Sequence, residues 1–226
     1  MFLKDLLFPK TCLCCGYLGA YICLACQKNL YKIKKYSCLY CERASPNGFT
    51  HQGCLRKNGI DGFISVFYYD NRLKKIIKEI KYRRVKQGLK ELLLLINHEP
   101  LKKLKTIITK NTYLQPIPLY STKEKERGFN QAELIVYRLS RLLNIPTIHL
   151  LKRVRPTVAQ AQLESKKERV ENIRQAFQVV NKEDNKEKNI ILIDDVVTTG
   201  STVKEAAKTL KKAGVSRVDV FTLAKG

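Results

Sequence analysis

The stretch Ile190-Ile191-Leu192-Ile193-Asp194-Asp195-Val196-Val197-Thr198-Thr199-Gly200-Ser201-Thr202 decides the fold of this chain. Its four leading apolar residues predict a buried strand. Asp194 and Asp195 stand at the carboxyl end of that strand, where open α/β sheets bind ligands. The loop that follows is rich in hydroxyl side chains and opens a helix, so it can direct backbone N–H groups and hydroxyls at one phosphate. The stretch therefore predicts a ribose 5-phosphate site, with the ribose diol on the two aspartates and the phosphate on Thr198, Thr199, Gly200, Ser201 and Thr202.

Other interpretations of this stretch have less support. An apolar strand that ends in acids also resembles a Walker B segment, which requires a G-x4-G-K-[ST] loop elsewhere in the chain. The nearest glycine spacing, Gly48 to Gly53, is followed by Cys54, and the sequence has no G-x-G-x-x-G for a dinucleotide. The remaining alternative is a buried strand followed by a helix that Asp and Thr side chains cap locally.

Strands and helices alternate around this stretch. Apolar and β-branched runs predict strands over Phe63–Tyr69, Thr112–Pro118, Thr147–Leu151, Gln175–Val180 and Arg217–Leu223. Apolar residues at helical spacing predict helices over Gln131–Leu143 and Ser201–Ala213, and a helical pattern runs from Asn71 to Ile96. This order predicts an α/β fold with a doubly wound parallel sheet that is covered on both faces.

All eight cysteines lie between Cys12 and Cys54. Their spacing gives three C-x2-C pairs and one H-x2-C pair, which indicates tetrahedral zinc sites rather than a disulfide scaffold. A closed shell of four ligands leaves no open position for chemistry, so we expect the zinc ions to be structural and to drive the folding of a small N-terminal module. Taken in chain order, the pairs predict one site from Cys12, Cys15, Cys23 and Cys26 and a second from Cys38, Cys41, His51 and Cys54.

Two points of this ligand assignment stay open. Cys14 is left over and could replace Cys15 in the first site, and His51 could be a bystander in the Asn47–Gly53 loop. Without any metal, these residues would be reactive or buried thiols. The composition changes after Cys54, which predicts a zinc-binding module over residues 1–57 and a larger domain over residues 58–226.

The chain is strongly basic. It carries 43 Lys and Arg residues against 20 Asp and Glu residues, a formal net charge of +23, which favours polyanionic partners. One run of basic residues contains Glu79 as its single acid, and it is either an anion-binding surface or a solvated helix face. This run consists of Arg72, Lys74, Lys75, Lys78, Lys81, Arg83, Arg84, Lys86 and Lys90.

The sequence also bears on location. No apolar run approaches the ~18 residues of a membrane-spanning helix. The Phe2–Phe8 stretch is too short and too charged for a signal peptide. We therefore expect a soluble, cytoplasmic protein.

Several stretches together resemble a known family. Residues 190–202 resemble the PRPP-binding signature of type I phosphoribosyltransferases. Zinc knuckles in front of such a domain are similar to the architecture of the ComF family, and the resemblance covers nearly the whole chain. It departs at His51, where relatives with two zinc sites usually have cysteine. Further matches to the ComF pattern are Pro116-x-Pro118, Arg127-Gly128-Phe129-Asn130-Gln131-Ala132, Arg153, Thr157, Gln160, Arg169, Asn172 and Phe177.

The resemblance implies a role for each matching residue. Asp194 and Asp195 would hold the ribose hydroxyls of PRPP with the help of Mg²⁺, and the Thr198–Thr202 loop would hold its 5-phosphate. Arg127 and Gly128 would form the pyrophosphate loop. The segment from residue 152 to residue 174 would be the mobile catalytic loop, with the basic residues Lys152, Arg153, Arg155, Lys166, Lys167 and Arg169.

The resemblance also implies a biological setting. ComF proteins are associated with DNA uptake in natural transformation, which suggests single-stranded DNA and a helicase-like ATPase of the ComF operon as partners. The alternative is an active phosphoribosyltransferase of nucleobase or nucleotide metabolism or salvage, with no role in DNA uptake. The motif predicts the PRPP pocket, and it does not determine the acceptor or whether transfer occurs.

Overall fold

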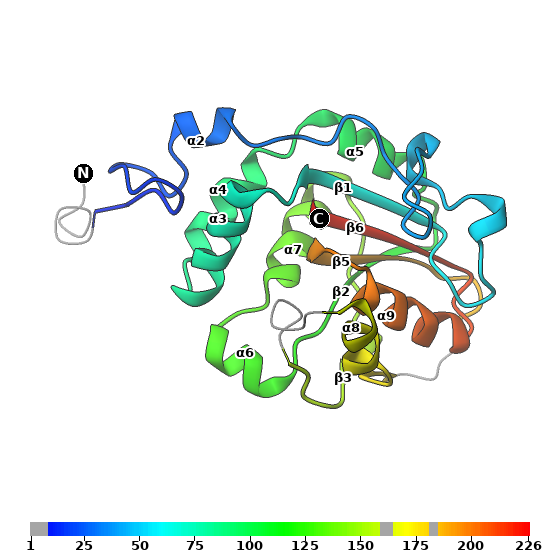
Figure 1. The fold of residues 1–226 in the computed structure, drawn as a ribbon. Coiled ribbons are helices and arrows are strands. Elements are labelled where there is room, and N and C mark those ends of the chain that lie inside the picture. The colour runs from blue at the N-terminus through cyan, green and yellow to red at the C-terminus, as the bar shows by residue number, and fades with distance from the viewer. Residues whose placement is uncertain (1–8, 159–164, 181–184) are drawn as a thin grey trace.

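A parallel sheet of four strands forms the centre of the molecule (Figure 1). The computed structural model describes residues 9–158, 165–180 and 185–226. The strands are hydrogen-bonded in the order β1-β6-β5-β2, and each neighbouring pair is parallel. Parallel neighbours need long crossover connections, and here those connections carry helices over the sheet. The strands are β1 (Gly62–Tyr68), β2 (Thr112–Pro116), β5 (Asn189–Val197) and β6 (Arg217–Lys225).

Helices cover both faces of this sheet. Ile191 and Ile193 of β5 belong to one core, and Ile190 and Leu192, which alternate with them, belong to a second. The predicted doubly wound α/β sheet is therefore confirmed. The first core also includes residues of α3 (Asn71–Tyr82), α4 (Lys86–Leu94), α5 (His98–Lys105) and α7 (Gln131–Leu143), and the second includes residues of α9 (Ser201–Lys212).

The two aspartates lie within β5 rather than after it. The apolar pattern predicted a strand that ends at Ile193, but β5 continues to Val197 because β6 keeps pairing with it as far as Lys225. Pairing with β2 ends at Ile193. Asp194 and Asp195 therefore extend past the end of β2, at the carboxyl edge of the sheet.

The expected strands Thr147–Leu151 and Gln175–Val180 do not join the parallel sheet, and this part of the prediction is wrong. The structure has a strand only from Leu151 onward near the first range, and a shorter strand inside the second. β3 (Leu151–Arg153) and β4 (Phe177–Val179) form a separate antiparallel pair. The chain separates from β2 because the Gln115 side chain, rather than a strand, accepts hydrogen bonds from the backbone N–H groups of Leu150 and Leu151, at 2.6 and 3.4 Å. Only Thr147 forms an isolated parallel bridge, to Leu114.

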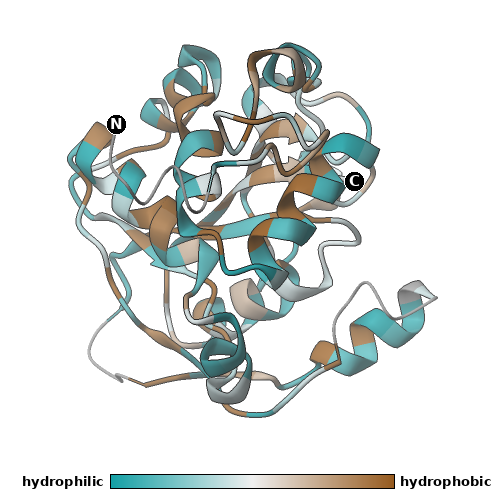
Figure 2. Cartoon of the chain, turned by 90° about the vertical axis from the view of Figure 1, so that its left-hand side faces the viewer, coloured by the Kyte–Doolittle hydropathy of each residue, from teal (hydrophilic) through white to brown (hydrophobic). Residues whose placement is uncertain are grey.

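The helices differ from the sequence pattern at two places. The pattern from Asn71 to Ile96 is divided between α3 and α4, because Arg84 between them has a positive φ of 56°. The short helix α6 (Ser121–Arg127) was not predicted, since it contains no apolar residue that would give a period. Hydrophobic and hydrophilic residues are mixed along the helices (Figure 2), and α8 (Lys166–Ile173) is the most polar of the longer ones.

The N-terminal residues pack directly on this sheet and its helices. They contain the short helix α2 (Leu24–Lys28) and 3-10 turns at Pro46–Gly48 and Gln52–Cys54. The Ile22 N–H donates to Glu91 of α4 at 2.9 Å, and Lys32 forms an antiparallel bridge with Phe67 on the outer edge of β1. Among the described residues, no helix has both the length and the apolar character needed to span a membrane.

Candidate functional site

Asp194 and Asp195 form the acidic centre of the candidate site. Lys81, near the end of α3, places its Nζ 2.6 Å from Asp195 Oδ2. The Asp194 Oδ1 atom accepts a hydrogen bond from the Asp195 backbone N–H at 2.8 Å. Since α3 lies on one face of the sheet, this ion pair connects the helix that bears the basic run to the carboxyl edge of β5.

This environment shifts the pKa values of the two carboxyl groups in opposite directions. Burial, together with the charge of Asp195, raises the pKa of Asp194 to about 7. Burial also acts to raise the pKa of Asp195, but the ammonium of Lys81 outweighs it and lowers that pKa, with Arg127 acting in the same direction. Near neutral pH the pair therefore carries a permanent charge on Asp195 and a titrating one on Asp194.

The hydroxyl-rich loop leads from β5 directly into α9. Gly200 has a positive φ of 74° and is the N-cap of α9, a conformation that glycine adopts without strain. The hydroxyls of Thr199 and Ser201 are 2.8 Å apart, and Lys204 donates to the Thr199 carbonyl at 3.2 Å. A small hollow is lined by Asp194 and residues 196–203. The hollow thus brings the N-terminal turn of α9 and the hydroxyls of the loop next to a carboxylate, an arrangement that suits a ribose phosphate.

Basic side chains surround the two aspartates. Lys123 of α6 donates to the Thr157 carbonyl at 2.6 Å, and Arg153 of β3 donates to the Thr157 hydroxyl. Burial lowers the pKa of Lys123, as do the positive charges of Arg153 and Arg127. Burial also lowers the pKa of Arg153, which the charge of Asp194 opposes. Lys81, Arg127 and Arg153 act on the charges of the two aspartates, and Lys123 lies close to these three cations, so the excess positive charge suits a ligand with several phosphates.

The other predicted site residues lie on separate elements. Arg127 ends α6, where it donates to Gln131 at 3.4 Å, and Gly128 follows as the left-handed C-cap with φ of 70°. Lys152 is exposed on β3 and alternates with the half-buried Arg153, so the two side chains point to opposite sides of the strand. Arg169 lies on α8. The structure thus groups Arg127 and Arg153 with the aspartates, and it does not group Lys152 with them.

The segment predicted as a mobile catalytic loop is described only in part. Residues 159–164, which include Gln160, lie outside the described residues. On the two sides of this gap, Val158 and Asn172 exchange two hydrogen bonds of 3.0 Å. Arg155 donates to the carbonyl of Arg174, which connects β3 to the end of α8.

Two cations of this site were missed as site residues. From the sequence, Lys81 was included only in the basic run, but the structure pairs it with Asp195 and so places it at the candidate site. A signal was present, since Lys81 follows the buried Ile77 by four residues and so lies at the border of the apolar face of α3. Lys123 gave no such signal, because α6 has no apolar face.

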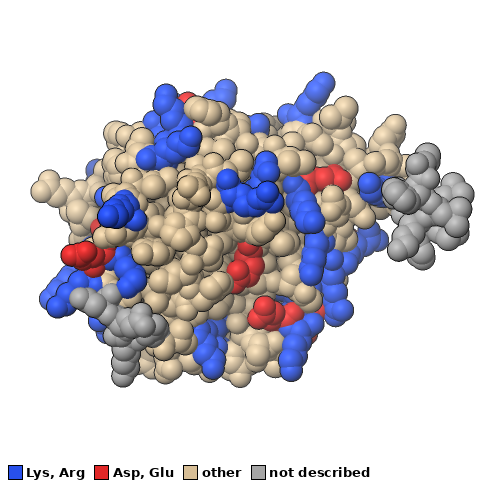
Figure 3. Space-filling view, turned by 180° about the vertical axis from the view of Figure 1, so that it is seen from behind, with Lys and Arg blue, Asp and Glu red and all other residues tan. Residues whose placement is uncertain are grey.

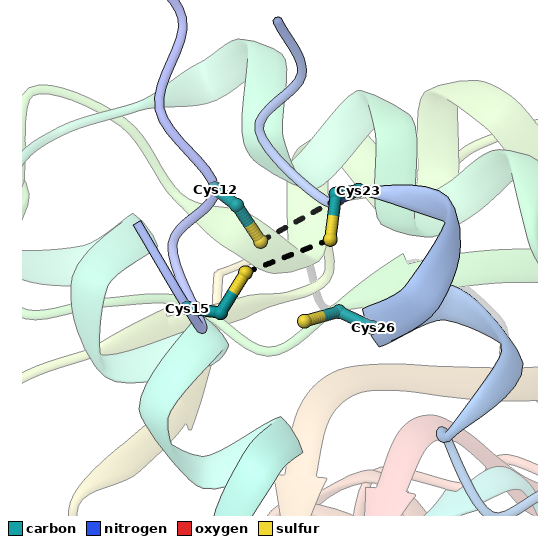
Figure 4. Close-up of side chains that lie close together, drawn as sticks. All are labelled: Cys12, Cys15, Cys23 and Cys26. Atoms are coloured by element: carbon teal, nitrogen blue, oxygen red, sulfur yellow. Dashed lines mark hydrogen bonds between the residues drawn. The ribbon is translucent and has the colours of Figure 1, made fainter. Parts of the chain in front are cut away.

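The first cysteine group brings its four sulfur atoms together (Figure 4). The sulfur atoms of Cys12, Cys15, Cys23 and Cys26 lie within 4.8 Å of one another, and those of Cys15 and Cys23 are 3.6 Å apart. Although burial opposes it, hydrogen bonds from backbone N–H groups lower the pKa of Cys12 to about 6. A thiolate is the form that binds a metal. This group could hold a metal ion, and it contains Cys15 rather than Cys14.

The second group has the predicted ligands as well. The ligand atoms of Cys38, Cys41, His51 and Cys54 lie within 4.8 Å of one another. His51 Nδ1 is 3.2 Å from the Cys41 sulfur, and Nε2 is 3.0 Å from the Ala44 carbonyl. A carbonyl only accepts, so Nε2 carries the proton and Nδ1 keeps a free lone pair. His51 therefore points a metal-binding atom into the group. Arg43 and then His51 lower the pKa of Cys41 to about 6.

The chain is similar to several known proteins. Residues 130–226 match the model of the phosphoribosyl transferase domain. Competence protein F of Haemophilus influenzae is 34% identical over 90% of this chain and 90% of its own length. Competence protein ComFC of Bacillus subtilis is 30% identical over 89% of this chain and 83% of its own length. DNA utilization protein YhgH of Escherichia coli is 30% identical over 95% of this chain and 96% of its own length. The structure of adenine phosphoribosyltransferase from Leishmania tarentolae aligns with 88% of this chain and 84% of its own length, at a TM-score of 0.37 and 14% identity. This similarity is too distant to carry an argument.

Proposed function

The chain belongs to the ComF family of competence proteins, and from this premise we propose that it binds PRPP or a related ribose 5-phosphate with Mg²⁺ and acts in DNA uptake. One observation carries the proposal. The hydroxyl-rich loop at the start of α9 and Asp194 line one hollow, Asp195 is paired with Lys81, and Arg127 and Arg153 are close enough for their charges to act on the aspartates.

Each part of the site has its own task. The backbone N–H groups and hydroxyls of Thr198–Thr202 hold the 5-phosphate, and the aspartates accept hydrogen bonds from the ribose hydroxyls. Arg127, Arg153 and Lys123 balance the charge of the pyrophosphate. When bound, Mg²⁺ supplies a hard cation that takes carboxylate and phosphate oxygens and neutralises part of their charge. Lys81 keeps Asp195 ionised and ready for this role.

Calorimetric titration of PRPP into the protein tests this proposal. We expect saturable binding in the presence of Mg²⁺ and strong weakening when EDTA removes the divalent cation. Ribose 5-phosphate should compete, because it carries the two groups that the hollow recognises. The proposal fails if PRPP does not bind at millimolar Mg²⁺, or if EDTA leaves its affinity unchanged.

We further propose that single-stranded DNA binds the basic run on α3 and α4. Its residues other than Lys81 are exposed, whereas Leu73, Ile76, Ile77 and Ile80 form the buried face of α3. Basic side chains also outnumber acidic ones on the face drawn in Figure 3. Such a surface neutralises phosphates without reading bases. The helicase-like ATPase remains a partner proposed from the family resemblance.

A transferase reaction is the second candidate function. Positive charge from Lys123, Arg127 and Arg153 is available to a departing pyrophosphate. In that reaction an acceptor nitrogen forms a bond to C1 as the C1–O bond to pyrophosphate breaks, the electron pair leaves with pyrophosphate, and the acceptor proton passes to solvent. An assay of pyrophosphate release with nucleobases and DNA ends as acceptors separates this function from binding alone.

We propose that both metal groups hold structural zinc. Each offers four ligands and no open position, which favours a structural over a catalytic ion. The eight cysteines carry no disulfide, and we propose a cytoplasmic location, where thiols stay reduced. A division of the chain into a zinc module over residues 1–57 and a phosphoribosyltransferase-like domain over residues 58–226 belongs to the same proposal.

A further inference from the structure

Tyr82, the last residue of α3, presents its ring to solvent. Its side chain is 74% exposed, the highest value among the large apolar and aromatic side chains of the described residues. The core face of α3 is formed by other residues of the helix, from Leu73 to Ile80, so the Tyr82 ring takes no part in the core. A single exposed aromatic residue is common on protein surfaces. The surroundings of this one distinguish it.

Lys74, Lys78 and Tyr82 form one row along the exposed side of α3. They follow one another at intervals of four residues, so they share a side of the helix and rise by about 6 Å from one to the next. All three side chains are exposed. The Lys78 Nζ atom lies 5.9 Å from the centroid of the Tyr82 ring, a cation–π contact that holds a positive charge beside the ring. The row thus joins two cations to an accessible aromatic surface.

Positive charge also surrounds the end of this row. Arg83 and Arg84 follow Tyr82, and both are exposed. The single acid of the basic run, Glu79, lies 3.2 Å from the Nε atom of Arg83 and balances only that one charge. Lys81 is directed away from the row, into its ion pair with Asp195. A partner that combines negative charge with flat apolar rings therefore fits the row better than an uncharged apolar surface does.

We propose that Tyr82 stacks on a base of single-stranded DNA while Lys74 and Lys78 bind its phosphates. The inference rests on the proposed function, because it adds a base contact to the DNA surface on α3. Every base has a π face, so stacking on an exposed ring contributes affinity without reading the sequence. The bases of a single strand are free to stack in this way, whereas those of a duplex are stacked on one another.

Fluorescence anisotropy with two labelled oligonucleotides of equal length tests the proposal. One is a mixed-sequence single strand, and the other is an abasic strand that has the same phosphates and no bases. Tyr82→Ala should weaken binding of the normal strand at least about 5-fold, the lower end of the effect of losing one stacked base. It should leave binding of the abasic strand unchanged. The slope of log affinity against log salt should also stay unchanged, because tyrosine neutralises no phosphate.

Two further variants serve as controls. Tyr82→Phe keeps the ring and should bind the normal strand as the wild type does. Tyr137→Ala removes a tyrosine of α7 that is 62% exposed and lies 5.7 Å from the Arg141 guanidinium, but outside the basic run, and it should have no effect. All variants should keep the unfolding midpoint and the PRPP affinity of the wild type, since the substituted side chains are exposed.

The outcomes separate stacking from the DNA surface on which it rests. The stacking proposal is overturned if Tyr82→Ala binds the normal strand like the wild type, if it weakens both strands equally, or if Tyr137→Ala loses as much affinity. In those cases, a salt slope that still flattens in Lys74→Gln with Lys78→Gln leaves the DNA surface on α3 in place. A wild type that binds neither strand contradicts both.

Discussion

Asp194 and Asp195 are neighbours in the chain, yet the fold acts on them in opposite ways. Asp194 is a carboxyl group whose pKa is raised to about 7, chiefly by burial, and Asp195 is kept ionised by Lys81. The sequence shows two adjacent acids and does not show this difference, because it depends on a lysine more than a hundred residues away. The difference has a measurable consequence for stability.

We expect Asp194→Asn to change how stability depends on pH. Between the ordinary pKa of an aspartate and about 7, Asp194 holds a proton in the folded protein but not in the unfolded chain. Its contribution to the free energy of unfolding is therefore fully present below the unfolded pKa and is lost as pH rises, by up to about 1.4 kcal/mol per pH unit. Asparagine cannot titrate, so the variant lacks this decline.

Chemical denaturation of both proteins at pH values from 4 to about 8 measures this effect. The wild type minus variant difference in the free energy of unfolding should fall with rising pH and level off above about 7. A difference that is flat across this range would show that Asp194 titrates normally.

At the scale of elements, α3 combines two surfaces. Its buried face packs in the core, most of its basic side chains are exposed, and Lys81 at the border reaches Asp195. A test of DNA binding on this helix must therefore leave Lys81 in place. Substitution of Lys81 would remove the partner of a buried carboxylate and disturb the ribose phosphate site as well.

Lys74→Gln with Lys78→Gln tests the proposed DNA surface. Each phosphate neutralised on a single strand adds about −0.7 to the slope of log affinity against log salt concentration. Loss of two phosphate contacts should flatten that slope by about 1.4, with PRPP binding unchanged. Fluorescence anisotropy with a labelled oligonucleotide at several salt concentrations measures the slope.

A matched control removes the same charge elsewhere. Lys102→Gln with Lys105→Gln takes two exposed lysines from α5 and should leave the slope near its wild-type value. If both double variants flatten the slope equally, binding depends on net charge and the basic run of α3 is a solvated face.

Elements with a strong apolar period were predicted well from the sequence. The bounds of α7 match the prediction, and those of α9 and β6 differ by one or two residues, because a buried stripe gives a clear helical or strand pattern. The polar helix α6 and the antiparallel β3–β4 pair were not predicted. Their formation depends on contacts distant in sequence, such as the Gln115 side chain that takes up the N–H groups of Leu150 and Leu151.

The candidate site, like the helices and strands, was predicted only in part from the sequence. The phosphate loop, the aspartates and both metal groups could be proposed from spacing, since each is a local pattern of a few residues. Lys123 and the role of Lys81 could not, because their contacts are made across elements. The roles of Lys152 and Arg169 stay predictions.

At the scale of the whole molecule, the first metal group is part of the main core. Leu13, which follows Cys12 of that group, packs against α4, where a Cβ added at Gly88 would lie 2.7 Å from the Leu13 side chain. Ile22, Cys23 and Cys26 belong to the same hydrophobic core as α3 and α7. Loss of the metal would therefore disturb the packing of the helices that position Lys81 as well as the N-terminal residues.

We expect two zinc ions per chain by elemental analysis. Cys23→Ser should lower the zinc content to one and lower the unfolding midpoint, because structural zinc in small modules contributes about 10–16 kcal/mol of binding free energy. Cys14→Ser is the matched control, since Cys14 is outside both groups, and it should keep two zinc ions. A protein purified without zinc, or a Cys14 variant that loses one ion, would contradict the assignment.

The affinity for PRPP of the Asp194→Asn, Asp195→Asn double variant tests the central claim most directly. The substitutions remove both carboxylates and keep their shape. Loss of two charged hydrogen-bonding groups corresponds to about 3–6 kcal/mol, so the account predicts at least about 100-fold weaker binding by calorimetry with Mg²⁺ present. The folded state is checked by the unfolding midpoint. Unchanged PRPP affinity in a folded double variant would contradict the assignment of this site.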